Sequence, residues 1–152
     1  MTGMIGNLLH ALHVLGAVVW VGGMVFALFV LRPALGPLAP AQRISLTGAV
    51  FARFFRIVWH AMPIVILSGY GLVFGVYGGF GMVHPLVHVM HATGLAMAVV
   101  FAALFFGPWA GMRTALAAGD MPAAAAAAER IRKRVLVNAI LGLITIALAA
   151  FA

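Results

Sequence analysis

The stretch His84-Pro85-Leu86-Val87-His88-Val89-Met90-His91 begins a long apolar segment and places three histidines in it. Positions 84, 88 and 91 share one face of an α-helix, because residues four and seven positions apart nearly eclipse one another. An ionisable side chain is costly inside a bilayer, so one that lies in a membrane segment marks a candidate functional site. The stretch therefore predicts an all-α membrane protein whose chemistry is carried by histidines.

The composition of the whole chain favours the same fold class. Of the 152 residues, 66% are hydrophobic and 7% are charged, whereas about a quarter of a soluble domain is charged. The absence of cysteine excludes disulfides, thiolate zinc sites and iron–sulfur clusters. The net charge of +7 comes from basic residues in two blocks, a distribution typical of membrane topology rather than of nucleic-acid binding.

Four apolar segments are long enough to cross a bilayer core of about 30 Å at about 1.5 Å per residue. We expect one transmembrane domain over residues 1–152, an up-and-down bundle of four helices at about 6–31, 46–74, 84–106 and 123–151. A signal peptide is the rival interpretation of the first segment. No basic residue precedes that segment and it is longer than a usual signal-peptide core, so we expect a retained helix. Ser45 or Thr47 is the expected cap of the second helix, and Gly107-Pro108 is expected to break or bend the third.

The lysine and arginine residues predict how the bundle is oriented. They lie between the first and second segments and between the third and fourth, at Arg32, Arg43, Arg53, Arg56, Arg113, Arg130, Arg132, Lys133 and Arg134. By the positive-inside rule these two loops are cytoplasmic and both termini are periplasmic, in a bacterial inner membrane.

A second histidine pair, His10 and His13, lies on one face of the first segment. The outer ends of the first and third segments are expected at the same membrane face, which matches His10 in depth with His88 and His13 with His91. The two levels are only about 4.5 Å apart along the helix, so the four side chains serve one haem or one compact metal site rather than two haems. We expect His13 and His91 to be the axial iron ligands because they lie deeper, and His10, His88 and His84 to lie near the rim.

Two further side chains are candidate ligands. His60 lies about a third to a half of the way across the bilayer in the second segment, and no other histidine shares its depth, so a cofactor role and a simple hydrogen-bonding role are equally expected. Met90, like His88, is an alternative metal ligand, since a thioether sulfur suits copper(I). No carboxylate lies in a membrane segment, which argues against hydrolytic chemistry and against proton-coupled transport.

Three polar or small positions are expected to join the helices. Asn138 and Thr93 are placed to hydrogen-bond across the bundle. Gly22-Gly23 offers a small-residue surface that a neighbouring helix or a porphyrin face can approach closely.

The residues Ala11-Leu12-His13-Val14-Leu15-Gly16-Ala17-Val18-Val19-Trp20-Val21-Gly22-Gly23, followed by Leu31-Arg32-Pro33, resemble the first helix of CopD-like membrane proteins. They are also similar to the opening helix of HemJ-type protoporphyrinogen oxidases. The resemblance implies a haem-b-binding helical bundle on the HemJ side, or copper uptake and resistance on the CopD side. HemJ-type proteins have a lysine where this chain has Met90. That departure argues against porphyrinogen oxidase activity and shifts the expected second ligand to His91 or Met90.

These observations together predict a membrane protein that binds one b-type haem and works in electron transfer or one-electron redox chemistry. It would be a haem-dependent membrane oxidoreductase if it is an enzyme. A copper-handling protein and a structural or assembly subunit are the alternatives. The expected partners are the lipid bilayer and a redox partner such as a quinone or a periplasmic electron carrier, with no nucleic acid, and a homo-oligomer is left open.

Overall fold

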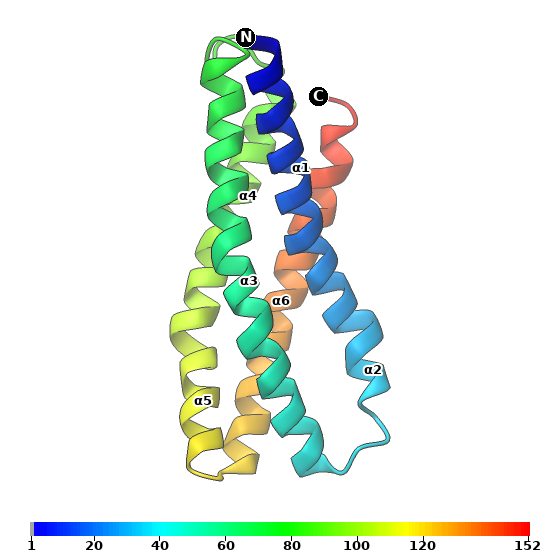
Figure 1. The fold of residues 1–152 in the computed structure, drawn as a ribbon. Helices are drawn as coiled ribbons and strands as arrows, with labels where there is room; N and C mark the ends of the chain where they lie inside the picture. Colours follow the sequence, from blue (N-terminus) through cyan, green and yellow to red (C-terminus); the bar gives the residue numbers. More distant parts are fainter. Residues whose placement is uncertain (1) are drawn as a thin grey trace.

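The computed structural model describes residues 2–152 and shows an all-α four-helix bundle (Figure 1). Two of the four rods are interrupted by a π-helical turn and so carry two labels each. The helices are α1 (Thr2–Phe26), α2 (Arg32–Ala34), α3 (Pro40–Gly75), α4 (Pro85–Leu104), α5 (Ala110–Ala117) and α6 (Met121–Ala149). The N- and C-termini lie near one end of the bundle and both basic connections lie at the other (Figure 1).

Three of the rods are long and apolar enough to cross a membrane, at Gly3–Ala34, Pro40–Gly75 and Pro85–Ala117. The fourth rod, α6, is apolar only in its second half, because Arg130, Arg132, Lys133 and Arg134 occupy its middle. The chain is therefore a helical membrane protein with several membrane-crossing helices, as the sequence predicts.

The structure extends the helices beyond the expected bounds. The second long helix begins at Pro40, so Ser45 and Thr47 lie inside it and neither is its cap; the Thr47 hydroxyl bonds instead to the Arg43 carbonyl, at 2.8 Å. The connection expected between the third and fourth helices, at about residues 107–122, is reduced to residues 118–120. Gly119 allows this tight turn because its φ of 72° is one that residues with a Cβ rarely adopt.

Proline and a capping side chain fix where the later helices begin. Pro85 and Pro122 lie in the first turns of α4 and α6, where a missing N–H costs nothing. The Asp120 carboxylate accepts from the Ala123 N–H at 2.9 Å, and His84 Nδ1 accepts from the Leu86 N–H at 3.3 Å. His84 is therefore a helix cap at the rim of the bundle.

Gly107-Pro108 does not end the third helix. The chain passes through a π-helical turn at Phe105–Trp109 and continues as α5. A second π-helical turn, Ala27–Leu31, precedes Arg32-Pro33 in the first rod. In both places a proline lacks the N–H that an α-helix would donate to the carbonyl four residues earlier, and a π-helical turn absorbs the defect without breaking the rod.

The order of the helices around the bundle determines which faces can meet. α1 packs mainly against α3, and α4 packs mainly against α6, while α6 also contacts α1. Among the described residues, α1 and α4 do not pack directly on one another. The two histidine-bearing helices are therefore diagonal in the bundle.

Glycines bring the helices close at several points, of which two bear on the expected packing. A Cβ on Gly142 of α6 would lie 2.6 Å from a Val21 methyl group and 3.0 Å from Met97 Cε, so α6 approaches both α1 and α4 there. A Cβ on Gly23 would lie 2.4 Å from the Phe54 ring, whereas one on Gly22 would meet nothing within 4 Å. Only Gly23 of the expected Gly22-Gly23 surface is thus a helix contact.

Most of the close packing lies in the half of the bundle next to the basic connections, although Ser68, Leu72 and Val73 of α3 are buried in the other half. Its core holds the aromatic side chains Trp20, Phe55, Phe101 and Trp109, together with the fully buried Met112 and Ile131. In the other half, among the described side chains, α1 has no buried residue before Gly16, α4 none before Met97 and α6 none after Gly142. The half that carries His10, His13, His88 and His91 thus lacks a continuous apolar core.

Two hydrogen bonds across the bundle confirm the expected roles of Asn138 and Thr93. Asn138 Nδ2 donates to the Met97 carbonyl at 3.0 Å, and the hydroxyl groups of Thr93 and Thr145 lie 2.7 Å apart. Both bonds join α6 to α4 and hold these helices in register.

Candidate functional site

His13 is the best-positioned candidate ligand, on the side of α1 that faces α3. Its Nδ1 lies 2.9 Å from the Val65 carbonyl oxygen and 3.3 Å from the Ser68 hydroxyl oxygen. A carbonyl can only accept, so Nδ1 carries the proton and donates it to Val65. Nε2, which has no hydrogen-bond partner among the described residues, is then the unprotonated nitrogen that a metal requires.

Gly69 gives the His13 ring its place against α3. A Cβ at residue 69 would lie 3.0 Å from Cε1 and 3.3 Å from Nδ1 of His13. The ring therefore rests on bare backbone and is held by a carbonyl of the same helix. This arrangement fixes both the tautomer and the orientation of the imidazole.

His91 is held by a phenol rather than by the backbone. Its Nε2 lies 2.8 Å from the Tyr70 hydroxyl, and its ring centroid lies 4.6 Å from that of Tyr70 and 5.1 Å from that of Phe80. The nitrogen that most often binds metal is therefore engaged. His91 can become a ligand through Nε2 only if the Tyr70 hydroxyl moves away, or else through Nδ1.

The remaining outer histidines lie at or near the surface of the bundle. His10 is exposed on α1 and has no hydrogen bond among the described residues. His88 is exposed on α4, and its ring lies 5.4 Å from the Phe80 ring. Met90, the alternative ligand, is half-buried beside them.

The structure does not bring the expected pairs into contact. His13 bonds to Val65 and Ser68 while His91 bonds to Tyr70, and among the described residues no hydrogen bond or ring contact joins the two histidines. Both nevertheless pack on one stretch of α3, between Val65 and Tyr70. That stretch is the common wall of the candidate site.

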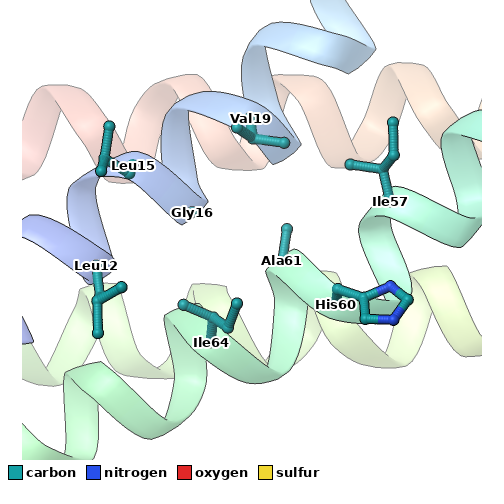
Figure 2. A pocket seen from close by; sticks show the side chains of 8 residues that line it. All are labelled: Leu12, Leu15, Gly16, Val19, Ile57, His60, Ala61 and Ile64. Atoms are coloured by element: carbon teal, nitrogen blue, oxygen red, sulfur yellow. The ribbon is translucent and has the colours of Figure 1, made fainter.

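His60 lies apart from this group, exposed on α3 at the edge of a groove between α1 and α3 (Figure 2). Its Nδ1 lies 2.7 Å from the Arg56 carbonyl oxygen one turn earlier. Over the described part of the chain, no three His, Asp or Glu side chains are grouped so that they would hold a metal ion. The copper alternative thus finds no ready set of three such ligands in residues 2–152.

Three of the residues that build the site were not expected from the sequence. Ser68 and Gly69 support His13, and Tyr70 bonds to His91. A serine, a glycine and a tyrosine side by side in an apolar helix were the available signal, since a buried hydroxyl group needs a partner.

Neither the family models, nor the curated proteins, nor the solved structures compared with this chain give a match. The likeness of its first helix to CopD-like and HemJ-type proteins therefore stays a prediction. The function of the site has to be inferred from the geometry of its own residues.

Proposed function

We propose that this membrane protein binds one b-type haem in the half of the bundle that carries the outer histidines, and that it works in electron transfer or one-electron redox chemistry. His13 would be the first residue to hold the haem iron. The observation that carries the proposal is the state of its ring, in which Nδ1 donates to the Val65 carbonyl and Nε2 is left as a lone-pair donor.

His91, which bonds to Tyr70 on the same stretch of α3, would be the second residue to hold the haem iron. Nε2 of His13 has no hydrogen-bond partner among the described residues and would be available to an iron. Nε2 of His91 would be available only if the Tyr70 hydroxyl, which now bonds to it, moved away. The loosely packed half supports the same site, since the inward faces of α1, α4 and α6 there are not sealed by an apolar core.

When bound, the haem supplies one-electron chemistry, and the protein tunes it through ligand identity, hydrogen bonding and burial. The Val65 carbonyl increases the basicity of His13, and the Ser68 hydroxyl limits rotation of the ring. His10 and His88, exposed in the first parts of α1 and α4, would be the partners of the haem propionates.

The orientation proposed for the bundle is based on its two charged ends. All nine lysine and arginine residues belong to the two connections and the helix segments next to them, at the end away from the termini. By the positive-inside rule that end is cytoplasmic, and the histidines are periplasmic in a bacterial inner membrane.

The test is a visible spectrum of the detergent-purified protein, oxidised and then reduced with dithionite, with metal analysis of the same sample. A Soret band with sharp reduced α and β bands supports the proposal. A colourless protein that carries copper would replace it with copper handling. A colourless, metal-free protein from haem-replete cells would leave the histidines as structural residues of a membrane subunit.

A further inference from the structure

A shallow apolar groove of about 390 Å³ runs between α1 and α3 on the surface of the bundle (Figure 2). Its floor is formed by two buried small residues, Gly16 and Ala61; a Cβ on Gly16 would lie only 3.5 Å from the Ala61 carbonyl oxygen. Its walls are exposed aliphatic side chains from both helices: Leu12, Leu15, Val19, Ile57 and Ile64. Both helices are long and apolar enough to cross a membrane, so the groove faces lipid.

Two arginines continue the α3 wall of the groove toward the end of the bundle that carries the basic connections. Arg53 and Arg56 are exposed and lie four residues before Ile57 and His60, which share one face of the helix with them. Gly75, the last residue of α3, is nineteen residues beyond Arg56, or about 28 Å along the axis. That length is close to the thickness of a bilayer core, about 30 Å. The two guanidinium groups therefore lie at the level of the lipid headgroups, and the groove lies in the hydrocarbon layer.

Among the described residues, no carboxylate pairs with these two arginines. The whole chain has only two acidic residues. The Asp120 carboxylate caps α6, and Glu129 is ion-paired with Arg132 on the same helix. Over residues 2–152, the Arg53 guanidinium donates only to a carbonyl of its own helix, at 3.3 Å, and the Arg56 guanidinium makes no hydrogen bond. The counter-charge of both arginines therefore comes from outside the chain.

We propose that this face of α1 and α3 binds one anionic phospholipid, whose phosphate is held by Arg53 and Arg56 and one of whose acyl chains lies in the groove. Arginine binds phosphate through charge-assisted hydrogen bonds from its planar fork. The aliphatic walls offer an acyl chain van der Waals contact, the main attraction between apolar groups inside a bilayer. A zwitterionic lipid matches less well, because its cationic group would find no carboxylate beside the arginines. The inference uses no property of the proposed haem site.

The test is native mass spectrometry of the full-length, delipidated protein in detergent, titrated with palmitoyl-oleoyl phosphatidylglycerol or with phosphatidylcholine of the same chains. The variant Arg53→Gln/Arg56→Gln removes both charges of the site. Its matched control, Arg130→Gln/Lys133→Gln, removes two exposed charges from α6, which does not line the groove. We expect one phosphatidylglycerol per chain, bound more tightly than phosphatidylcholine. Its affinity should fall about tenfold in Arg53→Gln/Arg56→Gln, because charge-assisted hydrogen bonds are lost, and should be kept in the control.

A second pair of variants tests the place of the acyl chain. Val19→Trp puts a bulky side chain into the groove, and Val18→Trp adds the same side chain at the neighbouring exposed position, which does not line it. Val19→Trp should weaken binding of both lipids, and Val18→Trp should bind as the wild type does. All substituted positions are exposed, so the helix content measured by circular dichroism should be unchanged.

Five results would overturn the assignment. Equal affinity of the wild type for the two lipids, a comparison that needs no variant, would leave an ordinary lipid contact. Equal weakening by both double variants would show general attraction to a basic surface, and an unchanged affinity in Val19→Trp would remove the acyl chain from the groove. Displacement of phosphatidylglycerol by inorganic phosphate would show a site for the free anion. A lipid-free dimer that Val19→Trp abolishes would make the groove an interface between two copies of the chain.

Discussion

The hydroxyl oxygen of Tyr70 lies 2.8 Å from Nε2 of His91, in a pocket of aromatic rings formed with Phe74 and Phe80. This bond joins α3 to α4 in the half of the bundle that carries the outer histidines. These two helices have few other contacts with each other. The bond also places a hydroxyl group on the nitrogen through which His91 would bind iron. Tyr70 therefore stabilises the observed position of His91 and would compete with an iron for Nε2.

Replacing Tyr70 by phenylalanine separates these two effects. In the haem-free protein, Tyr70→Phe should lower the free energy of unfolding by about 1 kcal/mol, because one interhelical hydrogen bond is lost. In the haem-loaded protein it should raise the fraction of low-spin, six-coordinate iron, because Nε2 of His91 becomes free. Chemical unfolding and the visible spectrum measure the two quantities. A fall in the low-spin fraction would show that Tyr70 positions His91 and does not compete with iron.

Gly69→Ala tests whether the bare backbone at residue 69 positions the His13 ring. The added methyl group would lie 3.0 Å from Cε1 of His13, so the ring must tilt away from the Val65 carbonyl. Haem affinity should fall by about 10-fold, the usual cost of disturbing a group that orients a metal ligand. Haem titration of the purified variant measures this. Gly94→Ala, whose Cβ would meet nothing within 4 Å, is the control and should bind as the wild type does.

Gly142→Val tests the packing of α6 on its neighbours. Its side chain would overlap Val21 and Met97 in the closely packed region. The variant should lose about 1–3 kcal/mol of stability, as overpacked cores do. Thermal unfolding in detergent, followed by circular dichroism, measures the loss. An unchanged midpoint would mean that the three helices do not meet at this glycine.

Single cysteines test the proposed orientation, because the natural chain has none. Gly81 and Ala118 are exposed and lie in connections at opposite ends of the bundle. In intact cells a membrane-impermeant maleimide should label Gly81→Cys and leave Ala118→Cys unlabelled until the membrane is opened. The reverse pattern would place the histidines on the cytoplasmic side.

Much of the fold is predictable from the sequence, because apolar length and proline positions are local signals. The four rods, the first-turn position of Pro85 and the bonds of Asn138 and Thr93 agree with these signals. The π-helical turns at the prolines were not predictable, since the same residues also fit a helix end. A helix end and a π-helical turn both relieve the missing N–H, so the local sequence does not choose between them.

The neighbours of each histidine are harder to predict, because depth in the membrane does not say which helix is adjacent. Matching depths suggested that His13 faces His91, but α1 packs on α3 and not on α4. Counting outward from the connection at residues 35–39 places residue 61 opposite His13, about one turn from the observed partner Val65. That count misses the small and polar residues 68 and 69, which lie about two turns beyond residue 61 and which the structure places beside His13.

The most direct test of haem ligation by His13 compares His13→Ala with His10→Ala in purified, haem-replete protein. The two histidines are three residues apart on α1, but only His13 is held by α3 with Nε2 free. We expect His13→Ala to abolish the reduced α band and most of the Soret absorbance, and His10→Ala to keep both bands and the haem-to-protein ratio of the wild type. An unchanged spectrum in His13→Ala, or a loss of equal size in both variants, would contradict His13 as the haem ligand.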